Sequence, residues 1–408
     1  MNKEWFKMNR PLSLIFSITI LSLLFSCRKV NDDCNVSAYK NAPNCSWIQS
    51  HSGSGEESHG HFILACNDGG FLQIGETGSN PRIIVIKTNE TGTLLWEKEF
   101  SEGSHNLGNS LIETDNEYVI CGALNKNSCV IRLNKSNGST IQSKTYENGG
   151  ADAIENITKT PSGYAAVGYN YAQDENNTFY TQGNAFLMLL DDNLNQTSFI
   201  NLNNYMSQAY RIKKHMQSLL ISGLTDGAND YALIKTDLSG NVIWDKTYGG
   251  NQDDHCFGMD LGIDGNVFLT GHTLSGTQNW DTYTMKIDSN GNSLWELKKG
   301  NPRGFDPKYI HDETWGIKAT NDGGCIIVAG TGDEYGSYKR RCGKNGDNSN
   351  EWRVYLIKIN ASGSLEWEQT YGGAGADWAG EDIDLTSDGG AIVAVDDASL
   401  GFLKIAPF

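Results

Sequence analysis

One stretch of the chain, residues 300–312, gathers side chains that could act on a polar substrate. It holds Arg303, Tyr309, His311 and Asp312. A carboxyl, an imidazole and a phenol can move protons, and a guanidinium can hold an anion. This set is the sequence basis for one candidate function, a polysaccharide lyase or glycosidase. The chain has no Gly-x-Ser-x-Gly elbow, P-loop or His-Glu-x-x-His motif, so no motif identifies it as an enzyme.

Several other long segments place aromatic residues beside polar ones. Such segments suit a sugar or peptide ligand, because aromatic faces pack against it and polar groups orient it. An alternative is that each aromatic side chain anchors its own loop. The candidate ligand-binding residues are Trp280, Asp281, Arg303, Phe305, His311, Asp312, Trp315, Tyr335, Tyr338, Arg340, Asp377 and Trp378.

Acidic residues recur at fixed positions. Asp152, Asp254 and Asp377 each lie six residues after a tyrosine, and Asp312 could be equivalent to them. They could bind calcium or a cationic ligand, or they could accept hydrogen bonds from backbone N–H groups of their own turns. No Asp-x-Asp-x-Asp-Gly calcium loop is present, so we expect no cofactor unless these acids hold calcium. His59 and His61 share one face of a strand, but no pattern of further ligands predicts a metal site there.

A repeated unit must position these segments. The segment 237–250, with Gly240, Trp244 and a Tyr-Gly-Gly end, recurs at 360–373. A second element, a turn of the Asp-Gly-Gly kind followed by an apolar run, occurs seven times. Each repeat reads as four short strands, A to D. Units of roughly 45 residues with this content predict an all-β fold, a seven-bladed β-propeller with four-stranded antiparallel blades.

The two ends of the chain predict how the ring closes. The last repeat stops at Phe408 before any strand D. The segment from Trp47 to Gly53 matches a strand D and has no strands A to C before it. We therefore expect the N-terminal strand to complete the last blade, which would leave no unpaired edge there.

The repeats resemble the secreted β-propellers with Asp-Gly-Gly and Tyr-Gly-Gly turns that are common among bacterial lipoproteins, with WD40-like strand order. This resemblance covers about residues 45–408 and implies a fold but little about function. In such a topology the D–A and B–C loops share one face, called the top face below. Its insertions are of unequal length, which is typical of a binding surface.

The N-terminus has the features of an export signal. Lys3, Lys7 and Arg10 precede an apolar run, which ends in Leu24-Phe25-Ser26-Cys27. This end resembles the bacterial lipobox, so we expect a signal peptide at 1–26, lipidation of Cys27, a polar tether at 27–44 and the propeller at 45–408. An ordinary cleaved signal peptide is the alternative. The expected location is the bacterial cell envelope, at the outer membrane, with membrane contact through the lipid alone.

The charge of the chain excludes one class of binding partner. The net charge of −17 excludes an electrostatic grip on nucleic acid. The hypotheses are a monomeric envelope protein that binds a glycan or a protein on its top face, the lyase or glycosidase, and an architectural subunit of an envelope complex. Export also permits disulfides, and the sequence allows Cys34 to pair with Cys45, or Cys121 with Cys129.

Overall fold

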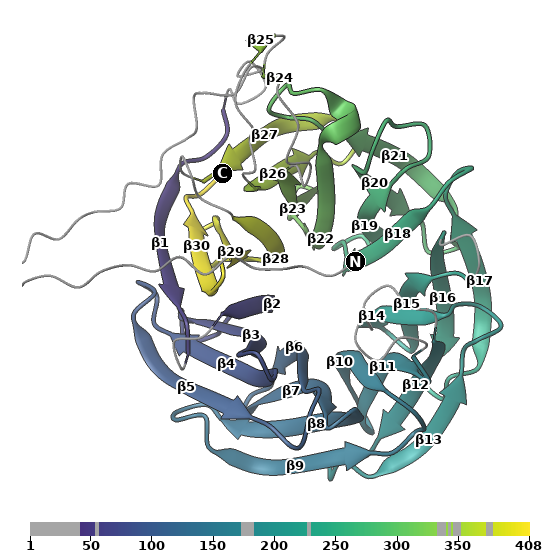
Figure 1. Ribbon diagram of the computed structural model, residues 1–408. Coiled ribbons are helices and arrows are strands. Elements are labelled where there is room, and N and C mark those ends of the chain that lie inside the picture. The colour runs from purple at the N-terminus through teal and green to yellow at the C-terminus, as the bar shows by residue number, and fades with distance from the viewer. Residues whose placement is uncertain are drawn as a thin grey trace, which may run out of the picture.

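Seven four-stranded sheets form a ring around a central axis (Figure 1). The computed structural model describes residues 41–53, 57–172, 183–226, 230–332, 340–341, 344–345, 352–372 and 378–408. Neighbouring strands within every sheet are antiparallel, and the prediction of an all-β seven-bladed β-propeller is confirmed.

The strands follow one another from the axis outward in each blade, numbered here in chain order. Blade 1 contains β2 (Ser58–Ala65), β3 (Phe71–Thr77), β4 (Arg82–Thr88) and β5 (Leu94–Phe100). Blade 2 contains β6 (Leu107–Glu113), β7 (Glu117–Leu124), β8 (Asn127–Asn134) and β9 (Thr140–Tyr146). Blade 3 contains β10 (Ala153–Thr160), β11 (Gly163–Asn170), β12 (Asn184–Leu190) and β13 (Gln196–Asn201). Blade 4 contains β14 (Gln208–His215), β15 (Ser218–Leu224), β16 (Tyr231–Asp237) and β17 (Val242–Tyr248).

The remaining blades carry the additional elements. Blade 5 contains β18 (Asp254–Leu261), β19 (Val267–Thr273), β20 (Asp281–Ile287) and β21 (Ser293–Lys299). Blade 6 contains β22 (His311–Ala319), β23 (Cys325–Gly332), β26 (Arg353–Ile359) and β27 (Leu365–Tyr371). Its B–C connection holds the short pair β24 (Arg340–Arg341) and β25 (Lys344–Asn345), and the 3₁₀ turn η2 (Pro307–Tyr309) precedes β22. Blade 7 contains β28 (Ala379–Leu385), β29 (Ala391–Asp396), β30 (Leu400–Ile405) and β1 (Cys45–His51).

Blade 7 is completed by the N-terminal strand. Strand β1 pairs antiparallel with β30, from Cys45 opposite Ile405 to His51 opposite Leu400, and the two strands lie side by side in Figure 1. Trp47 projects toward blade 1, where its ring centroid lies 5.8 Å from that of Phe71. The predicted closure is confirmed, and it joins the two ends of the ring by a ladder of backbone hydrogen bonds.

A repeated ion pair explains why the sequence motifs combine Asp-Gly with Leu/Ile-Lys. The lysine on strand C reaches back to the aspartate of the A–B turn at 2.7–3.0 Å in four blades: Lys87–Asp68, Lys286–Asp264, Lys358–Asp322 and Lys404–Asp388. These ammonium groups are almost fully buried, and a buried charge requires a partner. The motif therefore stabilises each turn.

Among the described cysteines, Cys45 on the edge strand β1 is the disulfide-bonded one. Its partner lies outside the described residues. The other cysteines of the described ranges are buried free thiols, namely Cys66, Cys121, Cys129, Cys256 and Cys325. Cys121 and Cys129 therefore do not pair, although they lie on neighbouring strands. Within the described part of the chain, no helix is long and apolar enough to cross a membrane.

Candidate functional site

Every innermost strand carries a β-bulge at the same position. The register of strand A against strand B shifts by one residue in all seven blades, for example between Gly60 and Phe62 in blade 1. A bulge leaves one extra residue unpaired and re-aims its side chain. The seven extra residues are His61, Asn109, Glu155, Tyr210, Phe257, Trp315 and Glu381.

These seven residues form a ring around the axis, which we call the bulge ring. Together with Arg211, they line one cavity of about 30 Å³. Each lies near the start of its strand, next to the loop that enters from the preceding blade, so the ring faces the top of the propeller. The fold thus brings one side chain from each blade to a single axial site.

One half of the bulge ring is aromatic. Tyr210, Phe257 and Trp315 come from the consecutive blades 4, 5 and 6. The ring centroids of Tyr210 and Phe257 are 4.9 Å apart, and those of Phe257 and Trp315 are 4.4 Å apart. These contacts cross the blade boundaries, so the three rings form one continuous surface, the aromatic arc.

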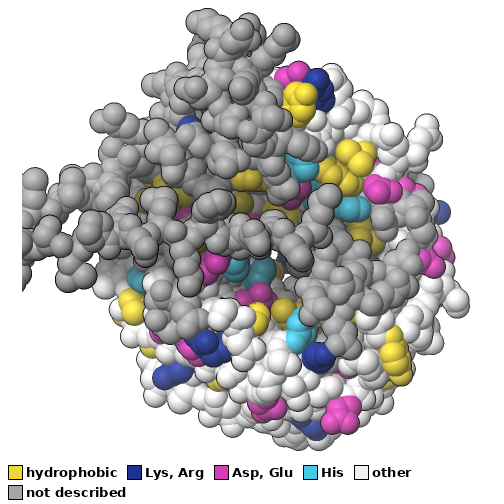
Figure 2. All heavy atoms as spheres, viewed as in Figure 1, with side chains coloured by type: hydrophobic (Ala, Val, Ile, Leu, Met, Phe, Trp, Pro, Cys, Tyr) yellow, Lys and Arg dark blue, Asp and Glu magenta, His cyan; other side chains and the backbone are white. Residues whose placement is uncertain are grey.

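The aromatic arc continues into a buried histidine pair and Trp280. The ring of Trp280 lies 4.7 Å from His255 and 4.8 Å from His272, and His272 lies 5.6 Å from Trp315. His255 Nδ1 and His272 Nε2 are 3.3 Å apart. Burial lowers the pKa of His255 and lowers that of His272 further, which keeps both rings neutral at pH 7. Hydrophobic and histidine side chains gather beside the axis on the face seen in Figure 2.

The other half of the ring is polar and carries paired histidines. His61 lies 3.3 Å from Glu76, and His59 Nδ1 lies 2.7 Å from Asp396. Burial opposes protonation of His61, but the Glu76 carboxylate and further acids outweigh it and raise the His61 pKa to about 9. In blade 6, His311 Nδ1 lies 3.2 Å from Glu313. Each of these histidines therefore has its own carboxylate.

Two carboxyls of the ring have no such partner. Glu155 is 5% exposed, and neither it nor Glu381 makes a hydrogen bond or ion pair with any described residue. Burial raises the Glu155 pKa to about 7 and the Glu381 pKa to about 8. Asp382, one residue further along β28, accepts a hydrogen bond from Ile63 N at 3.1 Å, yet burial still raises its pKa to about 6.

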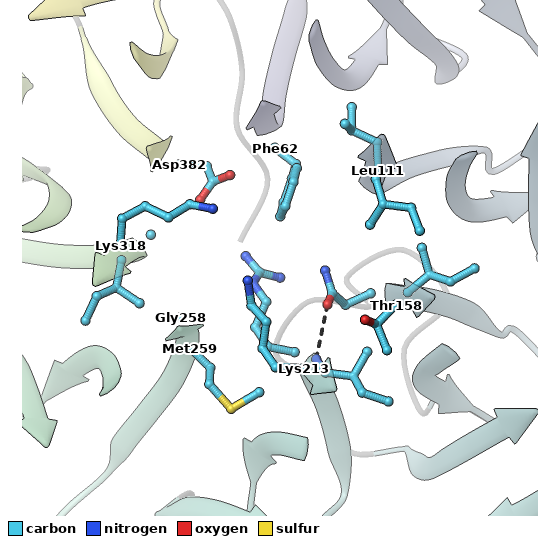
Figure 3. A pocket seen from close by; sticks show the side chains of 15 residues that line it. Phe62, Leu111, Thr158, Lys213, Gly258, Met259, Lys318 and Asp382 are labelled. Carbon is cyan, nitrogen blue, oxygen red and sulfur yellow. Dashed lines mark hydrogen bonds between the residues drawn. The ribbon is translucent and has the colours of Figure 1, made fainter. Parts of the chain in front are cut away.

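Below the bulge ring, the channel is neutralised by internal pairs. Lys213 pairs with Asp260 at 3.0 Å, and Lys318 pairs with Asp384 at 3.1 Å. Figure 3 shows Lys213, Lys318 and Asp382 directed toward the axis from different strands, and this cavity measures about 90 Å³. The lower channel thus satisfies its own charges, whereas the upper ring does not.

The residues predicted from the sequence fall into four groups. Trp315 belongs to the bulge ring and lines the axial cavity, and Trp280 packs against the histidine pair beside it. Asp281, His311 and Trp378 are half-buried at blades 5, 6 and 7, and burial raises the pKa of Asp281 to about 6. Tyr335, Tyr338, Asp377 and Cys27 lie outside the described residues, and only the backbone of Arg340 is described.

Three side chains of the cluster in residues 300–312 are buried. Arg303 is 1% exposed and Phe305 is 4% exposed, with the guanidinium over the phenyl ring at 4.6 Å. Asp312 is fully buried, and its carboxylate accepts a hydrogen bond from Asn301 N at 2.6 Å. Burial raises the Asp312 pKa to about 7. These three side chains are buried in the structure, and their part in ligand binding stays a prediction.

The recurring acids also hold loop backbone. Asp152 accepts from the N–H groups of Ser128 and Asn148, and Asp254 accepts from Gly250 N at 2.6 Å. Of the two interpretations of these acids, the geometry favours turn stabilisation. Among the described residues, no three His, Cys, Asp or Glu side chains are arranged to hold a metal ion.

The sequence did not predict the importance of Glu155, Tyr210, Phe257 or Glu381. A signal does exist, because each is the third or fourth residue of strand A in its repeat. Their chemical types differ from blade to blade, however, so a search for a shared motif passes over them. Only the bulge reveals that these positions point to the axis.

Comparison with known proteins supports the fold. No protein-family model matches the chain, and no curated protein shows significant sequence similarity to it. Virginiamycin B lyase from Staphylococcus aureus is similar in structure, with 15% identity, 88% of this chain and 98% of that chain covered, and a TM-score of 0.54. The Pan2 WD40 domain from Neurospora crassa has 12% identity, 88% and 94% coverage, and a TM-score of 0.53. YCF48 bound to D1 peptide has 10% identity, 90% and 100% coverage, and a TM-score of 0.51.

These identities show shared architecture only. The ring of blades with WD40-like strand order is common to this chain and its structural neighbours. Propellers of this kind serve binding, scaffolding and catalysis, so the function has to be argued from the site.

Proposed function

We propose that this protein is a lipid-anchored binding protein of the bacterial cell envelope, which captures a segment of a partner protein at the bulge ring. The observation that carries the proposal is the division of the ring into an aromatic arc and a polar half with unpaired carboxyls. A peptide segment offers apolar side chains for the arc and polar groups for the other half.

Two further observations support binding over catalysis. Two of the four residues that suggested a lyase or glycosidase, Arg303 and Asp312, are buried, and the Asp312 carboxylate accepts a hydrogen bond from its own loop at Asn301 N. In addition, each ring residue lies in a strand that pairs with its neighbour on both sides of the bulge, which holds the site in a fixed frame. A pre-formed site on a rigid frame lowers the entropic cost of binding a partner. A peptide is also bound to the structural neighbour YCF48.

A photocrosslinking experiment in cells tests this proposal. A photoreactive phenylalanine analogue replaces Tyr171, which is 57% exposed in the B–C loop of blade 3, on the top face. The control position is Ile263, which is 77% exposed in the A–B turn of blade 5, on the opposite face. We expect discrete protein adducts from position 171 and none from position 263.

The alternatives give different results in the same setting. Adducts from position 263 alone would place the partner on the other face and contradict the proposal. If position 171 gives no adduct and the purified protein binds polysaccharides, the ligand is a glycan. Equal, stoichiometric adducts from both positions would indicate an architectural subunit enclosed in a complex.

A further inference from the structure

We propose that the bulge ring binds one basic group, an ammonium or a guanidinium, between Glu155 and Glu381 and over the aromatic arc. This inference rests on the proposed function and deepens it by naming the chemistry of the captured group. The group could belong to a lysine or arginine side chain of a partner protein or to a small free amine, and the experiment below separates these sources.

The first step is the unpaired state of the two carboxyls. Glu155 lines the cavity at 5% exposed, and no described residue gives it a hydrogen bond or an ion pair. Glu381 lines the same cavity from blade 7, also without a partner among the described residues. A buried carboxylate without a partner is costly, so such a pair of groups is explained best by a ligand that supplies the missing charge.

The second step is that the nearby positive charges are already in use. His61, His59 and His311 are paired with Glu76, Asp396 and Glu313 respectively. Arg211 is the remaining cation that lines the cavity, and its Nη1 donates to Tyr210 O at 3.1 Å.

Arg211 faces the carboxyls of Glu155 and Asp382, and the His61 ring faces those of Glu155 and Glu381. Burial raises the pKa of all three. Glu155 and Glu381 line the upper cavity without an ion-pair partner among the described residues, so this cavity has two carboxyls that no cation neutralises directly. A bound cation would correct this deficit.

The third step is the aromatic arc. In blade order, Glu155 of blade 3 and Glu381 of blade 7 flank Tyr210, Phe257 and Trp315 of blades 4 to 6. Aromatic faces attract cations, and Trp does so most strongly. A cation over the arc would meet a carboxyl at either end. The cavity of about 30 Å³ admits a terminal group and not a bulky ring.

Binding of a cation should release protons. Glu155 faces Arg211, His61 and Glu76, while Glu381 faces Asp396, His61, Glu313 and His59. At pH 7 Glu155 is about half protonated and Glu381 is mostly protonated, and an arriving cation would drive both to ionise. Affinity should therefore rise as the pH rises from 6 to 8. His61, with a pKa of about 9, stays protonated throughout this range.

The test is calorimetric titration of the purified full chain with the capped tripeptide Gly-Lys-Gly. The Nζ-acetylated tripeptide is the neutral control, and butylamine represents a free amine. We expect the lysine peptide to bind and the acetylated one not to bind. Two buffers of different ionisation enthalpy at one pH should show protons released on binding. Tighter binding of the peptide than of butylamine indicates a polypeptide side chain, and the reverse order indicates a small amine; both orders support a cation site.

Substitutions localise the effect. Glu155→Gln and Glu381→Gln should each weaken binding about tenfold or more, because a charge-assisted hydrogen bond is lost. Trp315→Leu should weaken it by about two- to fivefold through the lost cation–π contact. Glu90→Gln removes an exposed carboxyl far from the ring and should leave the affinity unchanged.

The inference is overturned if the acetylated peptide binds as well as the lysine peptide, if no basic probe binds at millimolar concentration, or if both glutamine variants bind like the unaltered protein. Melting curves check that the variants fold, and the isosteric Gln variants should melt at or above the unaltered protein at pH 8. A crosslinked partner whose capture ignores Glu155 and Glu381 would refute this inference alone. Amine binding without any crosslinked partner would refute the proposed function alone.

Discussion

The indole of Trp315 packs on the phenyl ring of Phe257 across the boundary between blades 6 and 5, with centroids 4.4 Å apart. Both are bulge residues, so the feature that breaks the ladder of each inner strand also builds the wall of the axial site. A substitution at either position should therefore change both the stability of the fold and the shape of the axial site.

Truncation of Phe257 should destabilise the protein. Phe257 is 1% exposed and contacts Tyr210, His272 and Trp315. Phe257→Ala removes a buried ring and should lower the free energy of unfolding by about 3–5 kcal/mol. Denaturant titration measures this change. Ile263→Ala, at a 77% exposed turn, is the control and should change stability by less than about 0.5 kcal/mol. Equal effects of the two substitutions would contradict the packing described for Phe257.

Removal of strand β1 should open the ring. Deleting residues 1–53 removes the ladder between β1 and β30 and the contact of Trp47 with Phe71. Each lost ladder hydrogen bond costs about 0.5–1.5 kcal/mol, and the exposed edge promotes aggregation. The control is deletion of residues 1–40, which keeps the hydrogen bonds from Tyr371 Oη to Pro43 O and from Ala406 N to Asn44 O, at 2.8 and 2.9 Å. Coinciding melting curves would show that the ring closes without β1.

Trp280→Ala should lower stability as well as binding. The sequence predicts Trp280 to be a ligand-binding residue, and in the structure its indole is half-buried and packs on His255 and His272. Loss of an aromatic contact costs about 0.5–1.5 kcal/mol beyond the lost burial. Thermal melting of this variant beside Leu294→Ala, an exposed position on blade 5, measures the difference. An unchanged melting temperature would contradict the packing of Trp280 on the two histidines.

The buried histidine pair should make the fold acid-sensitive. Burial lowers the pKa of His272 and of His255, so the unfolded state binds more protons below pH 6.5. Their contribution to stability is full above pH 6.5 and is lost as the pH falls below it. His272→Phe keeps an aromatic ring and removes one titrating group. Its stability relative to the unaltered protein should rise between pH 6.5 and pH 5, as followed by denaturant titration at each pH. A difference independent of pH would contradict the neutral, buried state of His272.

Lipidation of Cys27 is a separate prediction. Cells labelled with a fatty-acid analogue should tag the unaltered protein, whereas Cys27→Ser should carry no label because the lipid-accepting thiol is gone. A Cys66→Ser variant controls for the loss of a thiol elsewhere in the chain. Equal labelling of the Cys27→Ser and unaltered proteins would contradict a lipid anchor at this residue.

The sequence by itself determined the fold and its closure. The spacing of the turns and of residues such as Trp244 and Trp367 repeats because every blade must place the same groups at the same contacts. A buried lysine such as Lys358 needs an ion-pair partner, which is the turn aspartate Asp322. The repeated Asp and Lys of the motif therefore predict the same turn geometry in each blade that carries them. The match of Trp47 to a strand D likewise predicted its pairing with the last blade.

The axial site was decided only by the tertiary structure. Glu155 and Glu381 are separated by more than half of the chain and share no motif, and they line one cavity only because the ring closes. Conversely, Arg303 and Asp312 are neighbours in sequence with the chemistry of an active site, yet folding buries both within their loop. Repetition fixes backbone geometry through local contacts. The side chains that the ring brings together at its axis are not constrained to resemble one another, so their meeting is a property of the closed ring.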